Sequence, residues 1–404
     1  MQKLLLLFLL IAISFISCRR TENNSSLLKS SNSDSSMLVL DFENQLADFW
    51  HTDTSALNHL AKSIRFIPLE VSSKSRLMNI NFHCYRWGDH YIVSSGILGN
   101  FSGVMSFDTL GGFEEMLIGI GHGPAELPFG LYEWSVDTQT QELVIHGGHQ
   151  TKLYSLPFHS VVRMDFKTHV TSLVPVADSV YAAIAESTPH SGSTTEPYLS
   201  FFTRNGERWK DLYYPGRRDI YQGRQEGRKA RIEEIKHLYS SGSGTALFKD
   251  LYNDTIYAVD KGSISPFLYL KMGRYSAKIK NIDNEDKKRE CFYFRGHGLS
   301  LSDQYVFVNY IHEGRNCSSV WERSTGRLLS NTIVYNEPGS PDATAMVNNK
   351  HFMRYRTPSG RIVVVGIVGV EPQRLYAILN PSDAKDFLPE VGMDSNPVLM
   401  EVWL

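Results

Sequence analysis

Apolar residues alternate with polar ones in short runs from Leu77 to the end of the chain, and the runs stop at turns rich in glycine, asparagine or aspartate. An alternation with a period of two indicates β-strands that bury one face. The pattern therefore predicts an all-β chain built from many short strands.

A polar turn that ends in glycine recurs along these strands. Glycine suits the positive φ that tight hairpin turns require. When the longest interval between turns is counted as two units, the repeat is about 45 to 65 residues long, which suits four-stranded propeller blades. The turns lie at 107–111, 202–206, 259–262 and 322–326.

We therefore predict a six-bladed β-propeller of four-stranded antiparallel blades. Pro68 cannot donate a ladder hydrogen bond, so the strand at 64–69 belongs at a sheet edge. We expect this strand to complete the sixth blade from the other end of the chain, which removes an open edge from the ring. The blades are expected at 77–117, 131–166, 169–212, 235–270 and 294–334, with a sixth from about Phe352 through 362–368, 375–379 and 398–403.

The glycine-rich stretch at 116–130 is expected to carry the chain from the first blade to the second. Gly121 and Gly123 permit a bend, while Pro124 fixes its own φ and turns Gly123 away from helix. A phosphate-binding Gly-x-Gly-x-x-Gly loop is not indicated. Its third glycine position falls on Pro124 or Glu126, and no helix pattern follows.

This Ile-Gly-x-Gly-x-Gly-Pro-x-Glu pattern after a hairpin resembles the six-bladed propeller lipoproteins of Bacteroides-type bacteria. Those chains usually have Gly-x-Gly-Pro-Gly-Glu followed by an aromatic residue, and this chain departs from them at Ala125 and Leu127. The resemblance extends to Ile-Pro-Leu-Glu at 67–70, Asn-Asp-Thr-Ile-Tyr at 253–257 and Asn-Pro-Val-Leu at 396–399. It implies a fold and a cell-envelope compartment rather than a reaction.

The first 17 residues are predicted to be a signal peptide. Lys3 supplies a charged start, and the apolar run at 4–16 is too short to span a bilayer. Phe-Ile-Ser before Cys18 resembles a bacterial lipobox, which implies that Cys18 becomes the lipidated N-terminus and anchors the protein to the membrane. The alternative is an ordinary signal peptide with an incidental cysteine.

Residues 18–36 are rich in serine and asparagine and are predicted to be a flexible tether, followed by the propeller at 37–404. Arg19 and Arg20 follow the cysteine, where surface-displayed lipoproteins of this group often have an acidic run. We therefore expect an outer-membrane anchor that faces the periplasm.

The formal net charge of −2 gives no indication of a nucleic-acid partner. Besides Cys18, the chain has Cys84, Cys291 and Cys317. A Cys291–Cys317 disulfide and buried thiols are both compatible with this number, and no Cys-x-x-Cys motif is present.

No sequence motif for a metal, cofactor or catalytic group is found. His-Glu-x-x-His, P-loop and Gly-x-Ser-x-Gly motifs are absent, and His146 and His149 have no third ligand beside them. We therefore assign no catalytic residue, cofactor or metal.

Four residues are candidates for a ligand site at the central channel. His122 and His297 occur in two Gly-His-Gly bends, and Glu126 follows the first of them. The Glu126 carboxylate is expected either to bind a ligand or to staple its own loop. Trp134 is expected either to stack on a sugar or to pack between blades.

These observations favour a membrane-anchored, non-enzymatic propeller that binds a protein, glycan or small molecule on one face of the toroid. One alternative is a hydrolase or lyase for a sugar, lactone or peptide, with residues from several blades converging on the channel. A structural or sensory component of an envelope complex is a further alternative.

Overall fold

The computed structural model divides into two compact units, Met1–Met37 and Leu38–Leu404, and the described strands all belong to the second. The predictions for the signal peptide, the tether and Cys18, and for Pro124 and His297, lie outside the described residues. No helix among the described residues is long and apolar enough to cross a membrane. The described residues are 37–46, 56–77, 83–97, 100–123, 126–127, 133–147, 150–157, 159–167, 170–177, 179–185, 197–213, 236–240, 245–250, 253–277, 290–294, 298–334 and 351–404.

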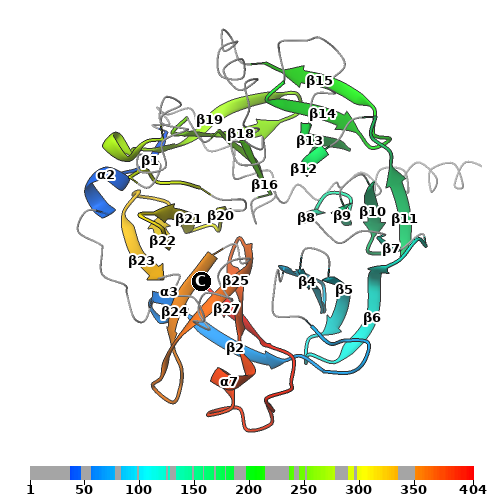
Figure 1. The fold of residues 1–404 in the computed structure, drawn as a ribbon, viewed down its shortest axis with the longest axis vertical. Coiled ribbons are helices and arrows are strands. Elements are labelled where there is room, and N and C mark those ends of the chain that lie inside the picture. The colour runs from blue at the N-terminus through cyan, green and yellow to red at the C-terminus, as the bar shows by residue number, and fades with distance from the viewer. Residues whose placement is uncertain are drawn as a thin grey trace, which may run out of the picture. The chain divides into compact units, whose positions relative to one another are not determined.

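The second unit is an all-β, six-bladed propeller, as the sequence predicts (Figure 1). The first five blades each contain four consecutive antiparallel strands, with the first strand nearest the centre of the ring. They are β3 (His83–Trp87), β4 (His90–Ile97), β5 (Asn100–Asp108) and β6 (Phe113–Ile120); β8 (Glu133–Asp137), β9 (Glu142–Gly147), β10 (Gln150–Ser155) and β11 (Ser160–Met164); β12 (Val170–Ala177), β13 (Val180–Ala185), β14 (Leu199–Thr203) and β15 (Arg208–Leu212); β16 (Lys236–Ser240), β17 (Ala246–Asp250), β18 (Thr255–Asp260) and β19 (Ser263–Leu270); and β20 (Leu299–Leu301), β21 (Tyr305–His312), β22 (Arg315–Glu322) and β23 (Leu328–Val334).

The sixth blade joins the two ends of the propeller unit. Its sheet has the order β2 (Ser63–Pro68), β27 (Val398–Trp403), β26 (Arg374–Leu379), β25 (Ile362–Glu371) and β24 (His351–Arg356). The antiparallel pairing of β2 with β27 confirms the predicted closing strand, and Pro68 lies in that edge strand. Because β25 contacts the inner strands β3 and β20, β25 is the inner strand of this blade and β24 is an addition to the four-stranded plan.

A buried carboxylate reinforces the closure between blades six and one. Glu401 of β27 accepts hydrogen bonds from Arg86 Nη1 at 2.8 Å, Arg374 Nη1 at 2.9 Å and the Tyr91 hydroxyl at 2.9 Å. Arg86 and Tyr91 belong to blade one, so these bonds connect the last strand of the chain to the first blade. Burial by itself raises the pKa of Glu401, but the hydrogen bonds from Tyr91 and Arg86 outweigh it and lower that pKa.

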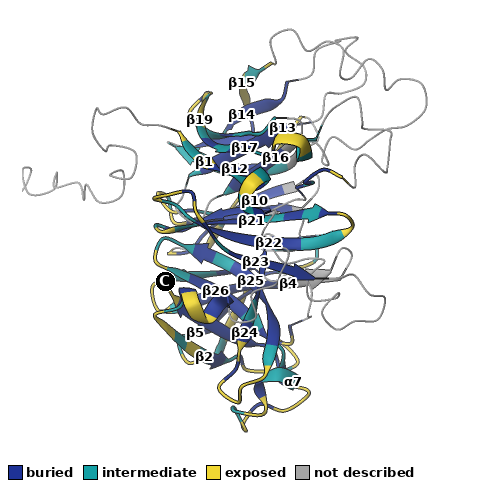
Figure 2. Cartoon of the chain, turned by 90° about the vertical axis from the view of Figure 1, so that its left-hand side faces the viewer, coloured by how far each residue is buried: buried dark blue, intermediate teal, exposed yellow. Residues whose placement is uncertain are grey.

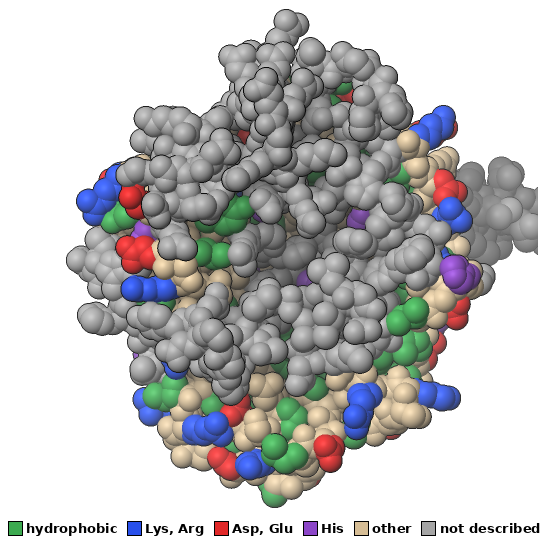
Figure 3. All heavy atoms as spheres, viewed as in Figure 1, with side chains coloured by type: hydrophobic (Ala, Val, Ile, Leu, Met, Phe, Trp, Pro, Cys, Tyr) green, Lys and Arg blue, Asp and Glu red, His purple; other side chains and the backbone are tan. Residues whose placement is uncertain are grey.

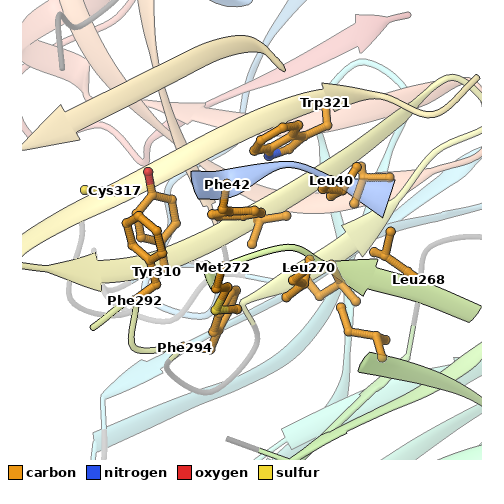
Figure 4. Packing of buried hydrophobic residues seen from close by; sticks show 14 of the residues in the cluster. Leu40, Phe42, Leu268, Leu270, Met272, Phe292, Phe294, Tyr310, Cys317 and Trp321 are labelled. Atoms are coloured by element: carbon orange, nitrogen blue, oxygen red, sulfur yellow. The ribbon is translucent and has the colours of Figure 1, made fainter. Parts of the chain in front are cut away.

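The first residues of the unit form a strap that the sequence did not reveal. Strand β1 (Leu38–Leu40) pairs in parallel with the outer edge of β19 and makes a fifth strand for blade four. Asp41 then caps α2 (Phe42–Gln45), its carboxylate accepting the Asn44 N–H at 3.0 Å. The Phe42 ring packs in a cluster of buried aromatic side chains, shown in Figure 4.

Short helices complete the fold. Helix α3 (Ala56–Leu60) buries Ala56, Leu57 and Leu60 against the sixth blade. Helix α7 (Pro381–Ala384) and the 3-10 turn η3 (Gly273–Tyr275) lie in connections. Figure 2 shows buried residues along the strands and exposed ones mainly at the turns, so the core lies between neighbouring blades.

The predicted glycine-ended turns lie between the third and fourth strands of their blades. Gly111, Gly206, Gly262 and Gly326 all have positive φ. At Gly111 a Cβ atom would also lie 2.2 Å from the Pro68 carbonyl oxygen, so this hairpin packs directly on the closing strand.

Candidate functional site

The bend after blade one lies where the sequence places it. Strand β6 is the fourth strand of blade one, and the short β7 (Glu126–Leu127) pairs with it in parallel through Gly119 and Ile120. The chain then enters β8, the inner strand of blade two. The predicted crossing between the two blades is therefore confirmed.

The carboxylate of Glu126 folds back over this bend. Its Oε2 accepts the Gly123 N–H at 2.8 Å, and the Glu126 N–H donates to the Gly123 carbonyl at 3.2 Å. Gly121 has a φ of 150°, and a Cβ there would lie 2.1 Å from the same Oε2. The glycines thus leave the space that the carboxylate fills, and Glu126 closes its own loop. Its role toward a ligand remains a prediction.

Lys152 of β10 secures the bend from blade two. Its ammonium donates to the Gly123 carbonyl at 2.8 Å and to the Glu126 carbonyl. Burial, together with nearby Arg163, lowers the pKa of Lys152, and Glu126 acts in the opposite direction. His122 is exposed between the two fixed glycines. Sequence reasoning missed Lys152, because a lysine within a strand pattern usually faces solvent.

Trp134 lies between blades one and two and is 5% exposed. Its indole N–H donates to the Ser94 hydroxyl at 2.7 Å, and its ring meets that of His83 edge-on at 6.0 Å. Buried tryptophan usually has such a partner for its N–H. This geometry is that of packing between blades, and a role of Trp134 toward a sugar stays a prediction.

The other described histidine and cysteine side chains considered from the sequence are buried and contact groups within the protein. The His146 ring contacts the Thr151 hydroxyl at 2.9 Å and the Val170 carbonyl at 2.7 Å, so both of its nitrogens are engaged, while His149 lies outside the described residues. Cys291 and Cys317 are buried thiols without a disulfide, as is Cys84, so the bridge considered from the sequence is wrong. Within the described ranges, no group of three or more His, Cys, Asp or Glu side chains is placed to hold a metal ion.

A second polar pair lies on the two inner strands of blade four, and the sequence did not single it out. His237 of the inner strand β16 faces Lys249 of β17 across the antiparallel ladder. The two side chains belong to residues that are 5% and 1% exposed. Histidine side chains are visible near the centre of the face in Figure 3.

Comparison with known proteins supports the fold. The family model described as "Domain of unknown function (DUF4934)" matches residues 40–402. A candidate exported protein from Bacteroides fragilis NCTC 9343 superposes with a TM-score of 0.61 at 13% identity, covering 91% of this chain and 99% of that one. An identity this low bears on the fold alone.

Two further solved structures are more distant. A DUF4221 family member from Bacteroides vulgatus has a TM-score of 0.44 at 10% identity, with coverage of 85% of this chain and 97% of that one. Virginiamycin B lyase from Staphylococcus aureus has a TM-score of 0.41 at 8% identity, with coverage of 85% and 99%. No functionally curated protein matches the sequence.

Proposed function

Since the chain belongs to the DUF4934 family, we propose that it is a membrane-anchored propeller lipoprotein that binds a protein or carbohydrate ligand on one face of its ring. The signal-peptide pattern and the lipobox-like Phe-Ile-Ser-Cys sequence support the anchor at Cys18. The similarity in fold to a candidate exported protein agrees with a location in the cell envelope. We place the anchor in the outer membrane, with the propeller facing the periplasm.

The hydrogen-bonded bend between blades one and two carries the proposal. Glu126 Oε2 and Lys152 Nζ are hydrogen bonded to the backbone of Gly123, and the adjacent His122 is exposed. A preformed surface lowers the entropy cost of binding a partner. A general acid or base, by contrast, must be available to substrate, and here both side chains are committed to internal bonds.

The test is a pull-down with the full lipoprotein from detergent-solubilised membranes, combined with a glycan array. We expect a retained protein or a bound glycan, and we expect His122→Ala to weaken its retention. The control is Leu110→Ala, because Leu110 is 76% exposed in a turn of blade one. Turnover of a sugar, lactone or peptide without any retained partner would favour the hydrolase or lyase instead.

A further inference from the structure

The outer strand of blade one carries exposed apolar side chains that lead to the bend at His122. Met116 and Ile120 of β6 are 38% and 56% exposed. Figure 3 shows hydrophobic side chains at the surface in the sector of blade one. His122 follows two residues after Ile120 and is exposed as well. Large apolar side chains that are exposed together, rather than singly, mark a contact surface.

Two glycines give Met116 the room to lie against the sheet. A Cβ at Gly103 of β5 would lie 2.3 Å from the Met116 sulfur, and one at Gly119 would lie 3.9 Å from its Cγ. The thioether therefore covers backbone that another side chain would otherwise fill. Methionine is flexible and polarisable, and it is common on surfaces that bind protein partners. This packing explains how Met116 is held, but it does not account for the exposed Ile120.

The edge of β6 is only partly covered within the described part of the chain. The Phe113 N–H donates to the Glu70 carboxylate at one end, and β7 pairs with Gly119 and Ile120 at the other. No described strand pairs with the outer side of residues 114–118. Register shifts in the β5–β6 pairing bend this edge, which disfavours a continuous added strand. A partner would therefore be recognised mainly through side chains.

Acidic side chains precede the apolar ones along the same strand. The side chains of Glu114 and Glu115 are 34% and 48% exposed. Glu114 accepts the Ser106 hydroxyl at 2.7 Å and contacts His90, whereas the Glu115 carboxylate lies 3.4 Å from exposed His159. A ligand along this edge meets negative charge at one end and apolar surface at the other. Such a surface is complementary to a segment with a lysine or arginine next to apolar residues.

We propose that the outer edge of blade one, from Glu115 to His122, docks an extended segment of a partner protein that carries basic and apolar side chains. This inference rests on the proposed binding function and narrows its ligand from a protein or carbohydrate to a protein. The aliphatic side chains of Met116 and Ile120 lack the flat aromatic face on which a sugar ring stacks. The charge of Glu115 disfavours an acidic segment.

The test is site-specific photo-crosslinking of the full lipoprotein in the cells that produce it. p-Benzoylphenylalanine replaces Ile120 or Met116, and replaces Val162 as the control, because Val162 is 41% exposed on the outer strand of blade two. We expect one protein adduct from the first two positions and none from Val162. Mass spectrometry should place the crosslink next to a lysine or arginine of the partner. Glu115→Lys should reduce the adduct about fivefold or more, whereas Glu207→Lys, at an exposed residue of blade three, should leave it unchanged.

Three results would overturn the docking edge: no protein adduct at either position, an equal adduct at Val162, or an adduct that a correctly folded Glu115→Lys variant leaves unchanged. Circular dichroism checks the folding of each variant. A crosslink to lipid, to a glycan or to a second copy of this chain would also overturn it. If the pull-down still retains a ligand that His122→Ala releases, the proposed binding function stands and only the docking edge falls. If no ligand is retained either, both fall.

Discussion

Phe42 stacks on Trp321 with ring centroids 4.8 Å apart and an interplanar angle of 27°. The first belongs to the strap that precedes the propeller strands, and the second lies in β22 of blade five (Figure 4). The strap also reaches the same blade through Gln45, whose side-chain amide bonds to Gly326 and Leu328. Blades four and five are thus fastened by residues far from them in sequence.

Replacing Phe42 by alanine should remove this fastening. The ring is completely buried and also meets Phe292 and Tyr310 edge-on, so Phe42→Ala is expected to lower the free energy of unfolding by about 3 to 5 kcal/mol. Urea denaturation measures the change. The control is Val39→Ala, at a residue that is 41% exposed on the same strap, and it should cost about 0.5 kcal/mol or less. Equal losses in the two variants would contradict the role given to Phe42.

Glu401→Gln should weaken the closure of the ring. Removing one charge from a buried group with two arginine partners should cost about 3 kcal/mol at pH 7. The pKa of Glu401 lies below its usual value of 4.5, so its contribution is present above that pH and is lost as the pH falls through the lowered pKa. The difference in unfolding free energy between wild type and variant should therefore shrink in acid.

The control for the closure is Glu313→Gln. Glu313 is 55% exposed, and its ion pair with Arg315 is 3.9 Å long, so the effect should stay within about 0.5 kcal/mol. A difference between wild type and Glu401→Gln that is independent of pH between 7 and 3 would show that the charge of Glu401 is not what matters.

Gly121→Ala should open the bend between blades one and two. The new Cβ would displace the Glu126 carboxylate from the Gly123 N–H and would also sit at a φ that L residues rarely adopt. We expect a loss of about 1 to 3 kcal/mol in thermal unfolding. Gly119→Ala is the matched control, because its nearest neighbours would be 3.9 Å away, and it should not destabilise. Similar melting temperatures for the two variants would refute the explanation of the motif.

Lys249 should make stability depend on pH in the alkaline range. Its pKa is lowered from 10.5 to about 8, so its contribution is present above pH 10.5 and is lost as the pH falls through about 8. Relative to Lys249→Met, the wild type should therefore gain up to about 3 kcal/mol of unfolding free energy between pH 8 and pH 10.5. The exposed variant Lys385→Met should follow the wild type. A constant offset between wild type and Lys249→Met would argue against a buried amine.

Cys18→Ser should abolish membrane attachment. We expect the wild type to partition into the detergent phase and to give an acylated N-terminal peptide by mass spectrometry. The variant should enter the aqueous phase, because no acyl chain holds it. An unmodified Cys18 in the mature wild-type protein would rule out the anchor.

The ring of blades and its closing strand could be predicted because residues next to each other in the sequence mark the turns and the edge strand. Gly111 and its counterparts mark hairpins through their φ, and Pro68 marks an edge strand through its missing N–H. The strap could not be predicted in this way. Leu38–Leu40 is too short to show the alternation of a strand. Phe42 is buried by aromatic side chains more than 200 residues away, so its own neighbours in the sequence give no sign of its role.

The polar groups of the candidate sites show the same limit. The Gly-His-Gly-Pro bend was recognisable at Gly121 and Gly123, but the lysine that secures it was not. Lys152 and Lys249 both occur in strands, where a lysine is expected to face water, and only the packing of blades against each other shows that they are buried. Sequence reasoning therefore finds bends more readily than it finds buried charges.

Strand β27 lies between β26 and β2, so the final strand of the chain is the only partner of one of the earliest in the described sheet. During synthesis, β2 is made more than 300 residues before β27 and must wait for that strand to emerge. A product truncated before Val398 would leave β2 without a neighbour and expose hydrogen-bonding edges to proteases and to aggregation. The arrangement thus makes synthesis of β27 a condition for closing the ring.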